Sequence, residues 1–419
     1  MQAAAGRDQA GVSRLTKCRS CSGAHLTTFL DLGVQPIANA LLDEKYLHDP
    51  EPKFPLELAF CRDCGLVQVT QTIPPEVLFG RDYPYYSSFS PALLAHSRDH
   101  VRSLLAQRKL GPNSLVIEVA SNDGYLLHNF LEAGVPVLGI DPAAGPAAAA
   151  RKRGIPTMQA FFGTDLAREL AAQGKQADIL IANNVVAHVD AINDFVGGFA
   201  LLLKDDGFAR LEFAYLRDLI EKCEFDTVYH EHLFYHSLIA IEPLLLRHGL
   251  HLNDAERLSI HGGSLRITVS KRPGESEQLV ALKQDETALG MGEISYYLSF
   301  SNRVEQLRER LVKLLQAERA NGARIAAYGA AAKGATLLNY VGLEPDVIEY
   351  VVDSNSHKVG KYMPGVKLPI RSVDTLMSDR PERVLILAWN FGTEIIEQNR
   401  EYVEQGGRFI LPVPVPRIV

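Results

Sequence analysis

The sequence predicts an α/β protein built from three units. Its 419 residues exceed what one ordinary hydrophobic core holds together, so we expect two or three domains. Two C-x-x-C pairs near the amino terminus indicate a small metal-stabilised module. Two later stretches alternate strand-like and helix-like segments, a pattern typical of parallel sheets covered by helices on both faces.

The first unit is predicted at residues 1–80 and depends on Cys18, Cys21, Cys61 and Cys64. The two intervening residues in CRSC and CRDC let both thiolates of a pair bind one small ion. No signal-peptide-like apolar run opens the sequence, so we do not expect disulfides. We predict one structural Zn²⁺ with four cysteine ligands. A redox dithiol is the alternative, which the matched second pair disfavours.

Composition restricts the possible partners. The net charge of −7, from 43 basic and 50 acidic side chains, lacks the clustered positive field that nucleic acids and anionic membranes require. No apolar run reaches the roughly 18 residues of a membrane span. We therefore expect a soluble cytoplasmic protein. We also expect it to be a monomer.

The second unit is predicted at residues 81–285. It opens with YPYYSSFS (83–90), which we interpret as a loop whose clustered aromatic residues are candidates for ligand binding. An amphipathic helix is predicted at 92–109. Strands are predicted at 114–121, 135–141, 177–185 and 207–214, with helices at 125–134, 147–154 and 192–204 between them. This alternation predicts a doubly wound parallel sheet.

The stretch VIEVASNDGYLL (116–127) predicts a strand, a tight loop and a helix. Class I methyltransferases that use S-adenosylmethionine carry an acidic-x-Gly-x-Gly-x-Gly run at this place. Glu118 and Gly124 fit its first and last positions, while Ala120 and Asn122 replace the other two glycines. A dinucleotide-binding fingerprint would need more glycine. A NAD enzyme and an unliganded sheet remain as alternatives.

Later segments support an adenosyl cofactor. Asp141 ends the next predicted strand, where a carboxylate can accept hydrogen bonds from both ribose hydroxyls. Residues 158–162 reach the expected adenine position, and residues 177–185 line the other side. The cofactor contacts that we expect are Glu118, Ala120, Ser121, Asn122, Gly124, Asp141, Pro142, Ala160, Phe161, Phe162, Asn183 and Asn184.

Residues 286–320 are predicted as a helical connector, and residues 321–419 as a smaller sheet of Rossmann type. The connector belongs to a helical stretch from about 285, whose apolar stripe is Tyr297, Phe300, Val304, Leu307, Leu311 and Leu314. In the last unit, GAAAKG (329–334) opens a helix after a strand, so its N–H groups can form an anion site. Lys333 would add a charge for a diphosphate. Trp389 could stack on a base or fill the core.

The segment DTVYHEHLFYHS (226–237) concentrates titratable side chains. The zinc-peptidase pattern H-E-x-x-H fails because residue 234 is phenylalanine, which disfavours a metal site. Histidine titrates near neutrality, so proton transfer is favoured over a solvated polar loop. His188 follows a predicted strand end and is expected to face the same cavity.

Together these segments resemble the deoxysugar C-methyltransferases that act on nucleotide-linked 4-keto sugars in antibiotic sugar biosynthesis. The resemblance covers nearly the whole chain. Its motifs, in chain order, are the paired C-x-x-C module, YPYYSSFS, EVASNDGYLL with GIDPA, NNVVAHV, FDTVYHEHLFYHS, HGGSLR, and YGAAAKGATLLN with YVVDSNSHKVGKYMPG.

The resemblance implies a zinc-binding N-terminal module, a central class I methyltransferase domain and a C-terminal Rossmann-like domain, with a dTDP-linked sugar between the last two. It implies methylation at C-3, next to the C-4 ketone, with His232 as the base and Tyr229 and Glu231 close by. His188 and Tyr83 map to further active-site positions, and His230 is another candidate donor. The implied substrate contacts are Tyr83, Tyr85, Tyr86, His261, Gly262, Ser264, Tyr328, Ala331, Lys333, Asp353, Lys358 and Trp389.

The chemistry separates this hypothesis from its rivals. A histidine can remove a sugar C–H proton only if the carbanion is delocalised into an adjacent carbonyl, so carbon methylation requires the ketone. Methylation of an oxygen or nitrogen needs no ketone and remains an alternative. An RNA-binding or RNA-modifying protein is a rival from another class, and the acidic charge balance disfavours it.

Overall fold

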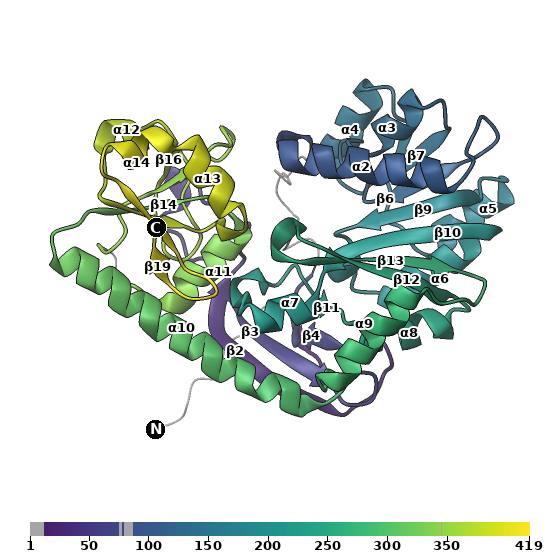
Figure 1. Cartoon of the computed structure of the whole chain (residues 1–419), viewed down its shortest axis with the longest axis horizontal. Helices are drawn as coiled ribbons and strands as arrows, with labels where there is room; N and C mark the ends of the chain where they lie inside the picture. The colour runs from purple at the N-terminus through teal and green to yellow at the C-terminus, as the bar shows by residue number, and fades with distance from the viewer. Residues whose placement is uncertain (1–11, 75–77, 79–86, 345) are drawn as a thin grey trace.

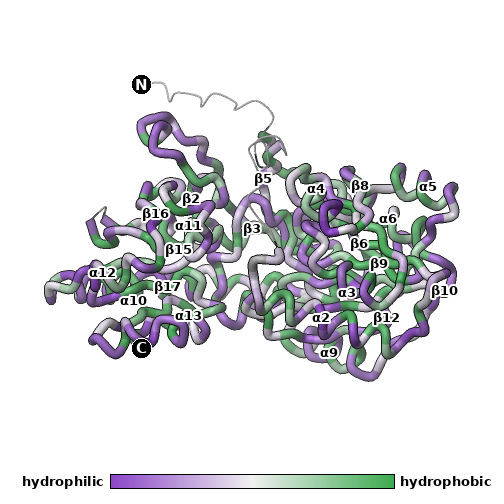
Figure 2. The backbone as a smooth tube through the Cα atoms, turned by 90° about the horizontal axis from the view of Figure 1, so that it is seen from above, coloured by the Kyte–Doolittle hydropathy of each residue, from purple (hydrophilic) through white to green (hydrophobic). Residues whose placement is uncertain are grey.

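The computed structural model describes residues 12–74, 78, 87–344 and 346–419. These residues form two lobes that are joined along one side by an N-terminal sheet and a long helix (Figure 1). Apolar stretches lie in the strands and the helix faces inside each lobe, and polar stretches lie mostly in the outer loops (Figure 2). No helix among the described residues is long and apolar enough to cross a membrane.

The N-terminal sheet has four antiparallel strands in the order β11-β4-β3-β2. They are β2 (Leu26–Pro36), β3 (Lys53–Cys61), β4 (Val67–Val69) and β11 (Phe234–Tyr235). A short pair, β1 (Ser13–Arg14) and β5 (Gln71–Thr72), lies beside it. The fourth strand, β11, comes from the histidine-rich segment far along the chain. The N-terminal sheet is therefore completed by the segment that we predicted to carry the chemistry.

The central sheet has seven strands in the order β12-β13-β10-β9-β6-β7-β8. The strands are β6 (Val116–Val119), β7 (Val137–Ile140), β8 (Thr157–Met158), β9 (Ala177–Asn183), β10 (Leu203–Ala214), β12 (His251–Leu258) and β13 (Ser264–Ser270). The five from β8 to β10 are parallel, as predicted. The hairpin β12–β13 adds an antiparallel edge that we did not predict. A wholly parallel sheet was therefore wrong at this edge, because β12 (HLNDAERL) is too polar to be read as a buried strand.

Helices cover both faces of the central sheet (Figure 1). They are α2 (Pro91–Gln107), α3 (Leu127–Glu132), α4 (Ala144–Lys152), α5 (Thr164–Ala172), α6 (Ile192–Leu202), α8 (Leu238–Arg247) and α9 (Glu277–Ala288). Successive strand residues point to opposite faces, so Ile179 packs in the apolar cluster of α2 and α3, and Leu180 in that of α6 and α8. The predicted α/β class with a doubly wound central sheet is confirmed.

The C-terminal sheet has the order β16-β15-β14-β17-β18-β19, parallel except for the last strand. The strands are β14 (Ile325–Tyr328), β15 (Val351–Asp353), β16 (Ile370–Ser372), β17 (Arg383–Ile386), β18 (Arg408–Leu411) and β19 (Arg417–Ile418). The helices are α11 (Ala332–Val341), α12 (Thr375–Asp379), α13 (Gly392–Gln398) and α14 (Arg400–Glu404). Strands β14, β15, β17 and β18 and helix α11 follow the predicted alternation, whereas β16 and β19 were not predicted.

The long helix α10 (Ile294–Ala320) joins the lobes (Figure 1). The predicted helical stretch from 285 is broken, because α9 ends at Ala288 and α10 starts only at Ile294. The last fully buried residue of the stripe is Leu315, and the predicted Leu314 is only partly buried. One apolar cluster includes the N-terminal strands, α10 and α11. The N-terminal sheet and the C-terminal unit therefore share a core.

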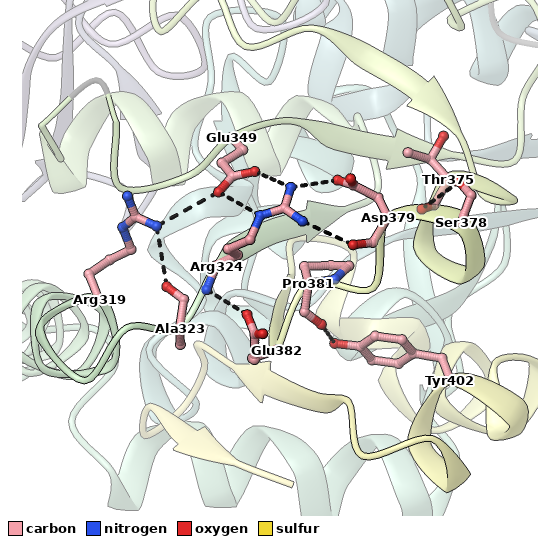
Figure 3. A network of polar contacts seen from close by, with 10 residues as sticks. All are labelled: Arg319, Ala323, Arg324, Glu349, Thr375, Ser378, Asp379, Pro381, Glu382 and Tyr402. Carbon is pink, nitrogen blue, oxygen red and sulfur yellow. Dashed lines mark hydrogen bonds and ion pairs between the residues drawn. The ribbon is translucent and has the colours of Figure 1, made fainter.

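A polar network braces the C-terminal sheet at the amino end of β14 (Figure 3). The Arg324 guanidinium lies 2.6 Å from a Glu349 oxygen and 2.8 Å from an Asp379 oxygen. The Arg324 backbone N–H also donates to Glu382 at 2.7 Å. Open α/β sheets bind ligands at the carboxyl ends of their strands. This network lies at the opposite edge, so it stabilises the sheet and leaves the ligand edge free.

Candidate active site

The histidine-rich segment is held by backbone hydrogen bonds on two sides. Its strand β11 pairs with β4, and the Val69 N–H donates to the Leu233 carbonyl at 3.0 Å. On the other side, the Leu233 N–H donates to the Ala187 carbonyl at 2.7 Å, in the 3-10 helix η3 (Val186–His188). Leu233 thus links the N-terminal sheet to the carboxyl end of β9, where doubly wound sheets bind their ligands.

The C-terminal unit contacts the same segment at its start. The Trp389 indole N–H donates to a carboxylate oxygen of Asp226 at 2.7 Å. The Thr336 hydroxyl, on α11, donates to the Val228 carbonyl at 3.1 Å. The N-terminal, central and C-terminal units therefore all have direct contacts with residues 226–236.

His232 has the arrangement of a neutral base. Its Nε2 lies 2.7 Å from the Tyr229 hydroxyl, and the Thr227 backbone carbonyl acts to raise its pKa. In the neutral tautomer with the proton on Nδ1, Nε2 accepts a hydrogen bond from the Tyr229 hydroxyl. Burial, the neighbouring His188 and the positive charge of Lys333 hold the pKa of His232 well below its usual value. The side chain is partly exposed, so a substrate can reach it.

His188 lies beside His232, with the two rings edge to face and 4.6 Å between their centroids. Its imidazole hydrogen bonds to the backbone carbonyl of Glu231, and burial lowers its pKa to about 4. His188 is therefore neutral near neutral pH and places no positive charge beside His232. The structure thus brings His188, Tyr229 and His232 together, as the sequence predicted.

Glu231 and His230 point toward the N-terminal sheet. A carboxylate oxygen of Glu231 accepts a hydrogen bond from the Asn39 amide at 3.1 Å, and burial raises the pKa of Glu231 to about 7. His230 Nε2 lies 3.2 Å from the Pro55 carbonyl, and its ring packs edge-on against Phe54. This geometry does not support our hypothesis that His230 donates to a substrate ketone.

His236 was missed as a candidate. It is buried, and neither of its ring nitrogens has a hydrogen-bond partner among the described residues. With His232 and Asn184 it lines an enclosed space of about 30 Å³, enough for one water molecule. Its position four residues after His232 was the available signal.

The loop after β6 has the backbone of a glycine-rich loop without its glycines. Ala120, Asn122 and Gly124 have φ angles of 56°, 50° and 78°, all in the left-handed region that glycine adopts most easily. At Gly124 a Cβ would lie 2.3 Å from the Ile155 Cδ1. Packing therefore favours glycine at 124, in addition to its positive φ angle. The loop thus keeps a conformation that brings backbone N–H groups close to a ligand, with strain at two positions.

Two buried carboxylates border this loop. Asp141 accepts hydrogen bonds from the N–H groups of Asn122 and Ala143, both at 2.8 Å, and thereby holds the loop against the end of β7. Glu118 is fully buried, and burial and the charge of Asp141 raise its pKa. Ser121 is also buried, whereas Pro142 is exposed. Asp141 is therefore oriented at the place predicted for ribose binding.

The predicted adenine contacts differ in what they face. The Phe162 ring packs edge-on against Phe195 and Phe199, with centroids 5.6 and 5.5 Å apart, so it belongs to the core beneath α6. The Phe161 side chain is 77% exposed and is available to a ligand, next to the half-buried Ala160. At the end of β9, Asn183 is partly buried and Asn184 is exposed.

The Lys333 ammonium is less free for a diphosphate than the sequence suggested. It donates to the Asn390 side chain at 2.9 Å and lies 4.5 Å from the centre of the Trp389 ring. Two buried carboxylates that we did not predict, Glu224 and Asp226, attract it. Burial raises their pKa values to about 7 and about 6, and Lys333 opposes the rise. These carboxylates partly balance the charge of Lys333 in this structure, and its contact with a diphosphate stays a prediction.

The HGG loop lies next to these groups. His261 has φ of 59° and Gly262 has φ of 99°, and a Cβ on Gly262 would lie 2.9 Å from a Glu224 oxygen. Ser264 is fully buried, and its hydroxyl donates to the Ile260 carbonyl at 3.2 Å, so it fixes the loop. Strained backbone of this kind is concentrated at functional sites.

The remaining predicted contacts of the C-terminal unit lie at the carboxyl end of its sheet. Asp353 accepts from the Ala330 N–H at 2.7 Å, and the Lys358 ammonium donates to the Ala330 carbonyl at 2.8 Å. Both side chains therefore hold the GAAAKG loop in place. Tyr328 ends β14 and Ala331 precedes α11. Tyr83, Tyr85 and Tyr86 lie outside the described residues.

The four predicted metal ligands form one cluster. Their sulfur atoms all lie within 4.8 Å of one another, and the Cys18–Cys64 and Cys21–Cys61 sulfur pairs are each 3.6 Å apart. Four sulfurs at about 2.3 Å from a tetrahedral ion would be about 3.8 Å apart, so this donor set fits Zn²⁺. The Gln68 amide donates to the Cys18 sulfur at 3.1 Å, which links the cluster to β4.

Comparison with known proteins identifies the family. The chain is 34% identical over 411 residues to the C-methyltransferase NovU of Streptomyces niveus, and the match covers 97% of this chain and 98% of NovU. This chain belongs to the same C-methyltransferase family. It is an S-adenosylmethionine-dependent enzyme, and a methyltransferase domain model matches residues 117–209. A C-methyltransferase C-terminal domain matches residues 259–414, and a "Putative zinc binding domain" matches residues 18–79.

Solved structures that are similar to this chain match less than half of it. One is magnesium protoporphyrin IX methyltransferase (ChlM) of Synechocystis PCC 6803, at 18% identity over 43% of this chain and 79% of that chain, with a TM-score of 0.33. Another is the PH0226 protein of Pyrococcus horikoshii OT3, at 16% identity over 46% of this chain and 98% of that chain, with a TM-score of 0.37.

Substitutions at Ala120 test the strain in the cofactor loop. We expect Ala120→Gly to leave the free energy of unfolding within about 1 kcal/mol of the wild type, because relief of the left-handed strain offsets the greater entropy of the unfolded glycine chain. Ala120→Val should lower it by more than about 1 kcal/mol, since a β-branched residue tolerates positive φ poorly. Urea unfolding measures both, with the exposed helical Ala172→Val as control. Equal effects of Val at 120 and 172 would contradict the strain.

Proposed function

We propose that the enzyme transfers a methyl group from S-adenosylmethionine to C-3 of a dTDP-linked 4-keto deoxysugar, through an enolate that His232 generates. The observation that carries this proposal is the state of His232. Its Nε2 lies 2.7 Å from the Tyr229 hydroxyl, its pKa is held low, and its side chain is partly exposed beside His188.

The ketone follows from the chemistry of carbon methylation. The family shows that the acceptor is a carbon, and a carbon must carry an electron pair to attack a methyl group. A neutral imidazole can remove a C–H proton only where the resulting charge spreads into a neighbouring carbonyl. S-adenosylmethionine supplies the electrophilic methyl group, and the enolate carbon then attacks it in line, a step that depends mainly on positioning.

Tyr229 is the proposed donor to the enolate oxygen. In this structure its hydroxyl lies 2.7 Å from His232 Nε2, the atom that must receive the substrate proton. The hydroxyl therefore leaves this nitrogen when the C–H group arrives, and its proton becomes available to the ketone oxygen. A donor that is aimed at developing negative charge lowers the barrier to the enolate. His188, beside His232, is oriented by the Glu231 carbonyl and completes the pocket.

The C-terminal unit is the proposed site of the nucleotide. The GAAAKG loop precedes α11, whose first N–H groups suit a phosphate, and the contacts of Asp353 and Lys358 hold this loop in place. The Trp389 ring is partly exposed at the same edge and can cover a base or a sugar. All of these groups belong to one chain, which supports a catalytic monomer.

We also propose one structural Zn²⁺ at the cysteine cluster. Four thiolates close the coordination sphere and leave no position for a substrate. The ion would then stabilise the N-terminal sheet, which carries β11.

Substitution of the base is the direct test of this function. We expect His232→Asn to reduce methyl transfer at least 1,000-fold, roughly the upper range of general-base effects. The affinity for S-adenosylmethionine should stay within about twofold of the wild type, because the loop after β6 that we expect to bind it does not include His232. Labelled cofactor and a panel of dTDP-linked 4-keto sugars measure the rate, and calorimetry measures the affinity. The exposed His128→Asn on α3 is the control. A His232→Asn enzyme with a rate near that of the wild type would exclude this base.

Removal of the metal tests the zinc proposal. We expect metal analysis to find one zinc per chain, and Cys61→Ser to lose both the zinc and the thermal stability of the N-terminal unit. Methyl transfer should fall with them, because β4 positions β11. A Cys61→Ser protein that keeps one zinc, or a wild type purified without zinc at full stability, would contradict this proposal.

A further inference from the structure

We propose that Asn39, a residue of the N-terminal unit, is a positioning residue for methyl transfer that holds the carboxylate of Glu231. This inference rests on the proposed function, because it assumes that Glu231 belongs to the catalytic pocket. It goes further in giving the N-terminal unit a part in the reaction besides metal binding.

The contact joins residues 192 positions apart in the chain. The Asn39 side-chain amide donates to one carboxylate oxygen of Glu231 at 3.1 Å, and the backbone N–H of Asn39 also lowers the pKa of this carboxylate. The other carboxylate oxygen has no partner among the described residues. Asn39 therefore supplies the side-chain donor that fixes the orientation of a buried acidic group.

The position of Asn39 is fixed by its own strand end. Ile37 and Ala38, which follow β2, are buried, and the Ala40 N–H donates to the Ile37 carbonyl at 3.1 Å. This turn presents Asn39 to solvent on one side and to Glu231 on the other. A residue anchored in this way can hold its partner without moving itself, as a supporting residue in a catalytic site must.

Asn39 also affects the charge of Glu231. Burial raises the pKa of Glu231, and the groups that lower it are neutral donors: the Asn39 amide, the Asn39 N–H and the N–H of Glu231 itself. Loss of the Asn39 amide therefore shifts Glu231 toward the protonated form at neutral pH. The ionisable groups near Glu231 include its chain neighbours His230 and His232. They also include His188, whose pKa the Glu231 backbone raises, and Tyr235, whose pKa the Glu231 charge raises.

Glu231 in turn connects to the base. Its backbone carbonyl accepts the hydrogen bond from His188, whose ring lies against His232. If the Glu231 side chain rotates or takes up a proton, the Glu231 backbone carbonyl shifts with it, and His188 and His232 shift in turn. Misplacement of a catalytic group by about 1 Å can cost about 100-fold in rate. Asn39 can thus influence catalysis without contacting the reacting atoms.

The test compares Asn39→Leu and Asn39→Asp with the control Asn253→Leu. Leucine has a similar size but no donor, and aspartate has the same shape but places a second carboxylate beside Glu231. Asn253 is a partly exposed asparagine. Its amide donates to the backbone carbonyls of Arg272 and Gly274, and it lies outside the histidine-rich segment. Each full-length variant is assayed with labelled S-adenosylmethionine and a dTDP-linked 4-keto-6-deoxyhexose as the probe.

We expect kcat to fall about 10- to 100-fold in both Asn39 variants, with the KM for S-adenosylmethionine and the zinc content unchanged. The acid limb of the kcat profile should move to higher pH in both, because the carboxylate loses donors or gains a like charge. Asn253→Leu should behave as the wild type. A folded Asn39→Leu with kcat within about threefold of the wild type, or an unshifted acid limb in Asn39→Asp, would overturn the proposal.

A parallel His232→Asn assay separates this inference from the proposed function. If His232→Asn is inactive while both Asn39 variants are fully active, only the role of Asn39 fails. If His232→Asn keeps its activity, the proposed base fails whatever the Asn39 variants do. If Asn39→Leu does not fold, the isosteric Asn39→Asp decides by its rate and its pH profile.

Discussion

The backbone pairing of β11 with β4 is the constraint on which the rest of this structure depends. Two residues from the middle of the chain complete a sheet whose other strands come from the N-terminal unit. Backbone N–H and C=O groups must be paired when they are buried, so this pairing specifies where Leu233 and its neighbours lie. On its other side, Leu233 is held by its hydrogen bond to the Ala187 carbonyl. The backbone of the neighbouring histidines is therefore fixed from both sides. The metal cluster contacts this segment through β4. The central unit contacts it through Ala187, and helix α11 through Thr336.

Burial of so many ionisable groups is costly, and its chemical consequence is a set of neutral histidines. Burial lowers the pKa values of His188 and His230 to about 4 and that of His236 to about 3. The histidines around His232 are therefore neutral near neutral pH. The same surroundings raise the pKa of Glu231 to about 7, so its hydrogen bonds decide its charge near neutral pH. A polar network of this kind functions only while each donor is in place.

The sequence predicted the parts of this protein that follow local patterns. The spacing of the cysteines, the strand–helix alternation and the identity of the histidine-rich segment all rest on residues close together in the chain. The hairpin β12–β13 was missed because its first strand is half polar, and Leu314 was chosen over Leu315 because both spacings fit a helical stripe. The contacts between Asn39 and Glu231, and between Lys333 and the carboxylates of Glu224 and Asp226, were out of reach. They depend on how the units pack, which no local pattern encodes.

We propose that His232 removes the proton from C-3 before the methyl group is transferred. The most direct measurement is hydrogen exchange at C-3 of a dTDP-linked 4-keto-6-deoxyhexose in deuterium oxide, with the enzyme present and S-adenosylmethionine omitted. We expect NMR to show enzyme-dependent uptake of one deuterium at C-3 with the wild type and no such uptake with His232→Asn. No exchange with the wild type, on a sugar that it does methylate, would contradict the enolate, and equal exchange in His232→Asn would contradict the base.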